Sequence, residues 1–210
     1  MKKTILCLLL MATAMTVAAQ QYNHNSRAPF FSGKDRYYGL RLGINSASLS
    51  SNVATMDYNA RAGLNVGAVV GLQLTTSAPI WLETGLFYSQ KGGKMTIGGD
   101  ETTLRMDYLQ VPIVVKYSFD VYDDLYIQPF IGGYLALGVG GKVKEYATHQ
   151  SHSAFDDLNR FDGGLRFGCG VEYMMLYAEV GMEFGLVNIN KSDFDTSRNQ
   201  NIFFTIGVNF

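Results

Sequence analysis

The chain is poor in cysteine, in proline and in excess charge of either sign, and each scarcity excludes a class of protein. Its 210 residues include two cysteines and four prolines, and 17 basic residues stand against 18 acidic ones. Two cysteines are too few for a disulfide scaffold, and a nearly neutral chain lacks the basic surface that nucleic-acid binding requires. The sequence has no phosphate-binding loop, paired-cysteine site or nucleotide fingerprint. We therefore expect no cofactor, no metal site and no nucleic-acid partner.

Long uninterrupted apolar runs are also scarce. Two charge-free segments, Ala62–Leu82 and Leu125–Gly141, have nearly the length of a transmembrane helix. Asn65 and Gln73 interrupt the first, and five glycines interrupt the second. Each glycine inside a helix costs about 1 kcal/mol relative to alanine, so we expect neither segment to be helical.

The first 19 residues have the features of a secretory signal peptide. Two lysines precede a short apolar run, and small residues precede a polar break after Ala19. This order is typical of a cleaved leader, and the apolar run is too short to cross a bilayer as a helix. Cleavage after Ala19 would remove Cys7 and leave Cys169 without an internal disulfide partner. It would also leave 15 basic residues against 18 acidic ones in the mature chain.

The remaining chain is rich in residues that favour strands. It contains 13 tyrosines and 13 phenylalanines, and the whole sequence has 23 glycines. The decisive pattern is an alternation of period two, which puts alternate side chains on opposite faces of a strand. In Leu176–Val187 the even positions are all apolar, whereas the odd positions carry Tyr177, Glu179, Glu183, two glycines and a valine. One face is therefore apolar, and the other carries acids and small residues.

The same alternation recurs often enough to predict eight strands, three of them with a noisier pattern. The predicted strands are Tyr38–Asn45, Gly63–Leu74, Ile80–Lys91, Leu109–Phe119, Leu125–Gly140, Phe161–Tyr173, Leu176–Val187 and Ile202–Phe210. On the apolar faces, aromatic residues gather toward both ends of the strands, as in the interfacial girdles of membrane barrels. Cys169 falls on an apolar face between Phe167 and Val171, where a small apolar filler is the simplest interpretation.

The connections between these strands alternate between long and short. The long ones are 45–62, 92–103, 141–160 and 188–200, and the short ones are 75–79, 120–124 and 174–175. This order is typical of an outer-membrane barrel, in which short turns face the periplasm and long loops face outward. We predict a signal peptide (1–19), a periplasmic lead-in (20–36) and an eight-stranded antiparallel up-and-down transmembrane β-barrel (37–210) with both termini periplasmic.

The strands of a soluble β-sandwich also alternate between apolar and polar residues, but their outer face carries charged and branched residues. Here the polar face is dominated by glycine and small residues, which suits the narrow interior of an eight-stranded barrel. The apolar face carries no charge over the 9–11 residues or so that cross a bilayer. Closure of the barrel would satisfy every backbone hydrogen-bonding group in lipid. Outer-membrane lipid is therefore an expected partner.

Seven charged residues fall on the inward-facing parity of the predicted strands. They are Arg41, Glu83, Lys116, Arg166, Glu172, Glu179 and Glu183. Such a set could form an ion or solute path, or it could be a self-neutralising network, because a buried charge is costly unless it is paired. Three bases facing four acids are nearly balanced, and an eight-stranded barrel is too narrow for an open channel. We expect a lumen-facing polar network and not an open pore.

The longest predicted loop carries His149 and His152 beside two serines and two aspartates. A hydrolytic site would use these residue types as base, nucleophile and orienting acid. One flexible loop does not hold three groups in working geometry, and neither serine lies in a glycine-flanked turn. Two histidines alone are also a weak signal for a metal site. We expect ordinary solvated side chains here and no enzyme activity.

The last strand ends in a pattern that resembles the signal read by the barrel-assembly machinery. Phe204, Ile206 and Val208 alternate in phase with the terminal Phe210. We therefore expect the assembly machinery to be a partner of the chain during its biogenesis.

The segment Asp107–Tyr117, with the sequence DYLQVPIVVKY, resembles the signature of the PorT-type outer-membrane barrels of Bacteroidetes. The matching motif residues are Tyr108, Leu109, Pro112, Lys116 and Tyr117. Further similarities lie at Gly39–Asn45, Gly85–Gly92, Phe161–Tyr173 and Gly185–Ile189. Many members of the family that the segment resembles have glutamate where this chain has Gln110. The resemblance implies the outer membrane of a Gram-negative envelope and leaves activity open.

Three hypotheses for function follow. The first is a non-enzymatic envelope structural or interaction protein that binds an extracellular partner through its outer loops, above all 141–160. The second is an accessory role in type IX protein secretion, which the resemblance implies because the protein that gives the family its name is tied to that system. The third is a barrel enzyme that acts on lipid or peptide at the loop of His149 and His152.

Overall fold

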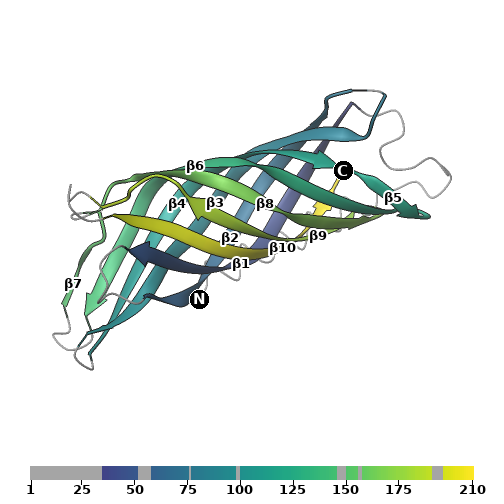
Figure 1. Cartoon of the computed structure of the whole chain (residues 1–210). Coiled ribbons are helices and arrows are strands. Elements are labelled where there is room, and N and C mark those ends of the chain that lie inside the picture. Colours follow the sequence, from purple (N-terminus) through teal and green to yellow (C-terminus); the bar gives the residue numbers. More distant parts are fainter. Residues whose placement is uncertain are drawn as a thin grey trace.

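The computed structural model describes residues 35–51, 58–75, 77–97, 100–145, 150–155, 158–190 and 196–210. The predicted signal peptide and nearly all of the predicted lead-in lie outside these residues. The described chain is an elongated barrel of slanted strands (Figure 1). No helix in the described ranges is long and apolar enough to cross a membrane.

Ten strands are seen in the described residues, and all of them belong to one sheet. They are β1 (Arg36–Ser51), β2 (Tyr58–Gln73), β3 (Ile80–Ile97), β4 (Asp100–Tyr117), β5 (Phe119–Tyr122), β6 (Leu125–Glu145), β7 (Gln150–Ser153), β8 (Phe161–Tyr173), β9 (Leu176–Gly185) and β10 (Ser197–Asn209). The short strands β5 and β7 pair with the two ends of β6 and extend from opposite ends of the barrel (Figure 1).

The other eight strands form a closed antiparallel cylinder. Each pairs with its neighbours in the chain, β4 pairs with β6, and β1 pairs with β10 from Gly39↔Asn209 to Ser51↔Ser197. The prediction of an eight-stranded antiparallel up-and-down barrel is therefore confirmed. Because the sheet closes on itself, the alternative of a two-layer sandwich is excluded.

The predicted long loops were wrong in extent, because part of each is strand. The segment predicted as a loop from Gly92 to Thr103 is a paired extension of β3 and β4 that continues to Ile97↔Asp100. Strand β1 likewise runs to Ser51, β6 runs to Glu145, and β10 begins at Ser197. These extensions lie beyond the apolar band, where no lipid imposes an apolar face, so the sequence lacks the alternation that would predict them.

The short connections lie where they were predicted. The turn after β5 has Asp124 at φ 61°, and the turn between β8 and β9 has Met174 at φ 55°. The segment predicted as a turn from Asp120 to Asp124 is shorter in the structure, because β5 pairs with β6 through Tyr122↔Leu125.

The two faces of the cylinder differ as the alternation predicts. Large apolar side chains lie exposed on the outside, among them Ile131 (67 %), Leu176 (60 %) and Leu135 (52 %). Val208 keeps the outer parity predicted for it, since it pairs with Leu40 and Leu176 of the outer face. Unlike Leu176, it is covered in the structure, with 4 % of its surface exposed.

Glycines make room for large rings inside the narrow cylinder. A Cβ at Gly71 would overlap the Tyr37 ring, and a Cβ at Gly170 would overlap the Tyr177 ring. The absence of a side chain at these positions lets each ring lie close to the backbone of the neighbouring strand. Small residues on the inner face are thus a requirement of packing.

Candidate functional site

The lumen near the end that carries the short turns is organised around the carboxylate of Glu83 on β3. Its Oε2 accepts a hydrogen bond of 2.6 Å from the Tyr37 hydroxyl and lies 3.4 Å from Nη2 of Arg41. Its Oε1 lies 2.8 Å from Nζ of Lys116. All four side chains are buried. One carboxylate thereby joins β1, β3 and β4 across the lumen.

Glu179 on β9 forms the second centre. Its Oε1 lies 3.1 Å from Nη2 of Arg166 and accepts a hydrogen bond from the Thr205 hydroxyl at 2.9 Å. Its Oε2 accepts from the Tyr177 hydroxyl at 3.0 Å and lies 3.7 Å from Nζ of Lys116. Lys116 therefore links this centre to Glu83.

Glu183, two residues further along β9, forms the third centre. Its Oε1 lies 2.5 Å from Nη1 of Arg166 and accepts a hydrogen bond of 2.6 Å from Gln110. Its Oε2 lies 2.9 Å from Nζ of Lys91 and accepts from the Asn201 amide at 3.1 Å. Each oxygen of this buried carboxylate thus faces one cation and one amide.

Lys91 extends the network to Asp162 on β8, at 3.7 Å from Oδ2. The same oxygen accepts hydrogen bonds from the Tyr134 hydroxyl at 3.2 Å and the Asn199 amide at 2.9 Å. The ammonium of Lys91 also lies 3.9 Å from the centroid of the Tyr134 ring. Desolvation of this cation is therefore offset by two carboxylates and an aromatic face.

Glu172 differs from the other interior acids. Its Oε2 accepts hydrogen bonds from the amides of Asn209 at 2.7 Å and Gln128 at 3.1 Å. Its Oε1 is buried and has no hydrogen-bond partner among the described residues. Neutral amides thus surround this carboxylate near the short-turn end of the barrel.

All seven charged residues predicted for the lumen are buried, and the structure adds Lys91 and Asp162 to them. Lys91 continues the inward parity of Glu83 on β3, but it stood at the end of the predicted strand. Asp162 stood on the polar parity of its strand but was not included in the predicted set. Among the described residues the interior therefore holds four cations and five carboxylates. This near balance favours a self-neutralising network over an ion path.

Aromatic rings fill the space between the charges. The Arg41 guanidinium lies 4.0 Å from the centroid of Tyr177, and that of Arg166 lies 3.8 Å from the centroid of Phe203. Such cation–π contacts stabilise a desolvated guanidinium.

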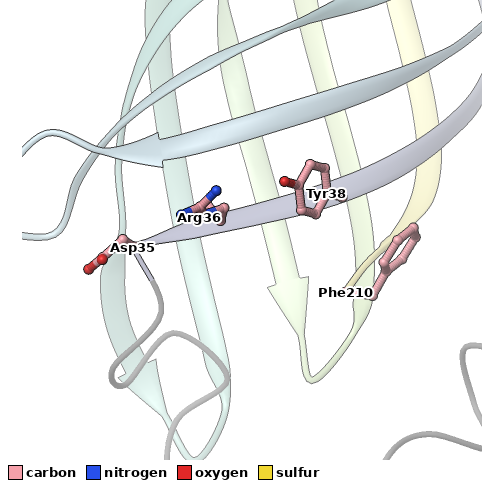
Figure 2. A pocket seen from close by; sticks show the side chains of 4 residues that line it. All are labelled: Asp35, Arg36, Tyr38 and Phe210. Carbon is pink, nitrogen blue, oxygen red and sulfur yellow. The ribbon is translucent and has the colours of Figure 1, made fainter.

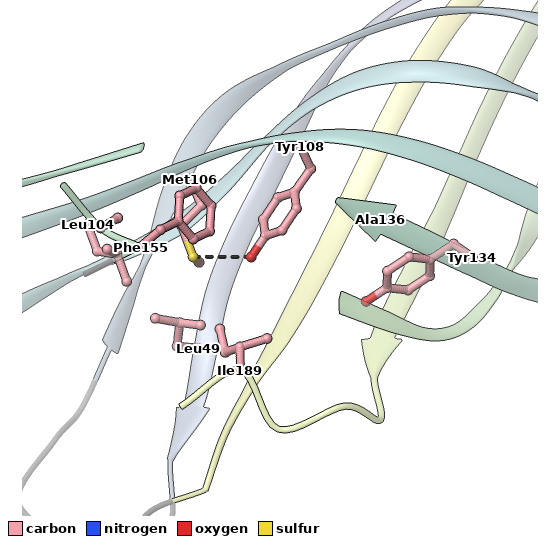
Figure 3. Close-up of a cluster of buried hydrophobic side chains, with 9 residues drawn as sticks. Leu49, Leu104, Met106, Tyr108, Tyr134, Ala136, Phe155 and Ile189 are labelled. Atoms are coloured by element: carbon pink, nitrogen blue, oxygen red, sulfur yellow. Dashed lines mark hydrogen bonds between the residues drawn. The ribbon is translucent and has the colours of Figure 1, made fainter. Parts of the chain in front are cut away.

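The opposite end of the lumen holds an apolar plug, which Figure 3 shows. Its members are Leu49, Leu104, Met106, Tyr108, Tyr134, Ala136, Ala154, Phe155 and Ile189. Phe155 follows β7 and meets the Tyr108 ring edge-on at 6.1 Å, while its own ring occupies the space above Gly138. Because Phe155 and Ile189 come from beyond the ends of β7 and β9, the connecting segments themselves contribute to the plug.

The residues of the family motif divide between the two faces of β4. Tyr108, Pro112 and Lys116 are buried, whereas Leu109 and Tyr117 are exposed on the outer face. The Thr84 hydroxyl donates a hydrogen bond of 2.8 Å to the Pro112 carbonyl. This contact lies where the β3–β4 ladder is interrupted between Thr84↔Ile113 and Phe87↔Gln110, since proline has no N–H to donate.

The predicted assembly signal lies along β10, at the seam that closes the barrel. Phe204 and Ile206 are exposed on the outside, as is the terminal Phe210. Phe210 and Tyr38 exchange backbone hydrogen bonds of 3.0 and 2.8 Å. Figure 2 shows their rings beside a shallow cavity of about 380 Å³ that Asp35 and Arg36 also line.

The predicted loop of His149 and His152 lies only partly within the described residues. His149 lies outside the described residues, and for His152 the structure gives the backbone pairing with Val143. Within the described ranges no group of three or more histidine, cysteine, aspartate or glutamate side chains could hold a metal ion.

Several solved structures have a similar barrel. OprG of Pseudomonas aeruginosa has 8 % identity over 84 % of this chain and 96 % of its own, with a TM-score of 0.50. Neisserial surface protein A has 15 % identity over 84 % and 98 % of the two chains, with a TM-score of 0.45. Ail of Yersinia pestis has 13 % identity over 84 % and 100 %, with a TM-score of 0.44. At such identities the likeness extends to the fold alone.

No curated protein sequence matches the chain. The profile of the family described as "Outer membrane protein beta-barrel domain" matches residues 18–191, which is most of the sequence. Together with the closed barrel and its apolar outer face, this match establishes an outer-membrane protein. The chain belongs to the outer membrane protein beta-barrel domain family.

Proposed function

We propose that this protein is a non-conducting outer-membrane barrel that acts as an envelope interaction protein through its outer end. The occupied lumen is the observation that carries the first part of the proposal. Buried ion pairs around Glu83, Glu179 and Glu183 fill one part of the axis, and the apolar plug around Phe155 fills the outer part. A solute would have to break several buried ion pairs to pass, and each such break costs a few kcal/mol.

The strand extensions supply the surface for contact. Beyond the paired residues Tyr88 and Leu109, β3 and β4 continue as a paired ribbon to Ile97↔Asp100. Nine residues at about 3.3 Å each carry this ribbon roughly 30 Å further along the strand direction. The β6–β7 pair extends from the same end (Figure 1). These ribbons are not needed to cross the membrane, so their surface is available for contact with a partner.

We infer the orientation of the barrel from the difference between its two ends, one with short turns and the other with long strand extensions. The tight turns at Asp124 and Met174 lie at the end where Tyr38 and Phe210 meet, and the long ribbons lie at the other end. Outer-membrane barrels keep short turns in the periplasm. We therefore assign both ends of the barrel domain to the periplasm and the ribbons to the cell exterior.

Two measurements test this function. In planar bilayers the purified barrel should show no stable conductance steps, and steady channel openings would overturn the non-conducting assignment. In cells, a photo-crosslinking amino acid at the exposed position Ser50, at the outer end of β1 and outside any charged cluster, should give discrete adducts with envelope components. The same probe at Val121 in β5, at the periplasmic end, is the matched control. Adducts at Val121 alone would contradict contact through the outer end.

An accessory role in type IX secretion is the second candidate, and the motif at Asp107–Tyr117 is the feature that favours it. Two of its residues have roles in the barrel itself, since Tyr108 lies in the plug and Lys116 pairs with Glu83. A deletion strain that exports type IX cargo normally would exclude this role.

A third candidate, enzyme activity at the histidine loop, has a separate test. The double variant H149A/H152A should leave lipid and peptide hydrolysis unchanged. Loss of a measurable hydrolase or acyltransferase activity would overturn the non-enzymatic assignment.

A further inference from the structure

A strongly basic cavity lies on the outer wall of the barrel, away from the lumen. Its volume is about 670 Å³, and its charged lining residues are Arg61, Lys94, Arg105, Lys142, Lys144 and a single carboxylate, Asp107. Five cations and one acid in one concavity contrast with the near neutrality of the whole chain. Such a field favours an anionic ligand.

The sheet register places the cations of β4 and β6 on the outward face. Leu104 and Met106 of β4 are buried in the apolar plug, so Thr103 and Arg105, which alternate with them, point outward. Lys142 pairs with Arg105 and Lys144 with Thr103 on the neighbouring strand. The cations of β4 and β6 therefore form one row on the outer wall.

A β-bulge in β6 is what brings the two lysines to this face. The register shifts between the pairs Tyr108↔Gly138 and Asp107↔Gly140. Val139, at the bulge, is exposed on the outside like Leu137 two residues before it. An uninterrupted alternation from Val139 would turn Lys142 and Lys144 into the plug, and the extra residue reverses this. Bulges commonly re-aim side chains in this way near functional sites.

The floor of the cavity is held in place. Arg105 donates to both oxygens of Asp107, through Nε at 2.9 Å and Nη2 at 3.0 Å, and its Nη2 also lies 3.5 Å from the Tyr88 hydroxyl. This two-pronged pairing fixes the guanidinium while leaving its side chain 43 % exposed. Above it Gly140 leaves open space, since a Cβ there would come no closer than 3.7 Å to another atom.

Arg61 supplies a buried donor, Nη1, for which no described residue provides an acceptor. Burial lowers the pKa of Arg61, and the neighbouring charge of Arg105 lowers it further. A buried donor without an acceptor beside a like charge is unfavourable, and a bound anion would remove both costs.

The height of the cavity identifies the kind of anion. Leu109 and Leu137 are exposed to lipid at 40 % and 53 %, and Asp107 and Arg105 follow Leu109 on the same face. At about 3.3 Å per residue and a strand tilt of about 40°, they lie roughly 5 and 10 Å further from the membrane centre. The polar headgroup layer extends about 5–8 Å beyond the hydrocarbon core. The cavity therefore opens at headgroup level directly above an acyl-chain surface.

We propose that this cavity binds the phosphate of an acylated, phosphorylated glycolipid in the outer leaflet, with the acyl chains lying along Leu109 and Leu137. Arg105 and the two lysines of β6 contact the phosphate, and Arg61 donates its unpaired N–H to it. The site stands apart from the proposed function, because it faces lipid and uses neither the lumen nor the tip of the β3–β4 ribbon.

The test compares ligands and variants on the detergent-solubilised full-length barrel. The ligands are bisphosphorylated lipid A, the same lipid after enzymatic dephosphorylation, and inorganic phosphate, with affinities measured by microscale thermophoresis. The double variant K142S/K144S removes two exposed cations from the site. The variant R36S/R198S removes two exposed cations elsewhere and is the charge-matched control.

Phosphorylated lipid A should bind at least tenfold more tightly than the dephosphorylated form. K142S/K144S should weaken its binding about thirtyfold, the effect expected of two cations at an anionic lipid surface, and R36S/R198S should leave it unchanged. Equal affinity for both lipids, or an unchanged K142S/K144S, would overturn the proposal. Inorganic phosphate that binds as tightly as the lipid would instead identify a soluble anion as the ligand.

Heat-modifiability on a gel checks that each variant is folded. If K142S/K144S does not fold, R61Q replaces it, because this substitution removes the buried Nη1 donor that is proposed to bind the phosphate. R61Q should then weaken binding of phosphorylated lipid A selectively. An effect equal on both lipids would contradict the phosphate contact.

Discussion

The substitution Glu183→Gln tests whether buried ion pairs stabilise the interior of the barrel, because it removes one charge from the lumen. The substitution keeps the shape of the side chain but removes the charge that faces Arg166 at 2.5 Å and Lys91 at 2.9 Å. Arg166 retains Glu179 at 3.1 Å, whereas Lys91 retains a carboxylate only in Asp162 at 3.7 Å. Loss of one partner from a buried pair typically costs about 3–5 kcal/mol. Because both cations keep a second carboxylate, we expect about 3 kcal/mol, the low end of that range.

Urea unfolding in lipid vesicles, followed by the fluorescence of the single tryptophan Trp81, measures this change. The matched control is Asp123→Asn, an exposed carboxylate in a short turn, which should change stability by less than about 0.5 kcal/mol. A double-mutant cycle with Lys91→Gln should show a coupling of about 1–2 kcal/mol between the two residues. An E183Q barrel as stable as the wild type would refute the claim that this pair organises the interior.

Three further predictions follow from the packing and from the two faces of the barrel. Gly71→Val should destabilise the barrel by about 2 kcal/mol in the same unfolding assay, because its side chain would overlap the Tyr37 ring. Ile131→Arg should cost about 2–4 kcal/mol in vesicles, because Ile131 is 67 % exposed on the apolar outer face of β6, between Ile127 and Leu135, whereas Tyr122→Arg in β5 should cost little. Phe155→Ala should open the outer end of the lumen, so that a cysteine placed at Leu104, in a chain lacking Cys169, reacts faster with a membrane-impermeant thiol reagent. Unchanged labelling of that cysteine would show that Phe155 does not close the lumen.

Period two in the sequence predicts the membrane-crossing part of the fold well, because lipid demands an apolar residue at every second position. Leu176–Gly185 shows this, since apolar and polar residues alternate in its sequence and exposed and buried residues alternate in its structure. The same reasoning assigned Glu179 and Glu183 to the lumen. Which cation each acid would meet could not be predicted, because the partners lie on strands far apart in the chain.

The end of the barrel opposite the short turns shows where the alternation stops predicting structure. From Gly92 to Ile97, β3 continues beyond the apolar band, so its sequence lacks the apolar alternation and is predicted as a loop. The bulge at Val139 has no signature of its own in the sequence, so simple parity would have turned Lys142 and Lys144 inward. The basic cavity therefore became visible only when the register was known.

The central claim is that apolar side chains face lipid while the charged network occupies the axis. Trp81 is buried in the lumen at 2 % exposure, so acyl chains brominated near the bilayer centre should leave its fluorescence nearly unquenched. In a W81F background, a tryptophan introduced by Ile131→Trp should be strongly quenched by the same lipid. Strong quenching of Trp81 together with weak quenching at position 131 would show that the faces are reversed.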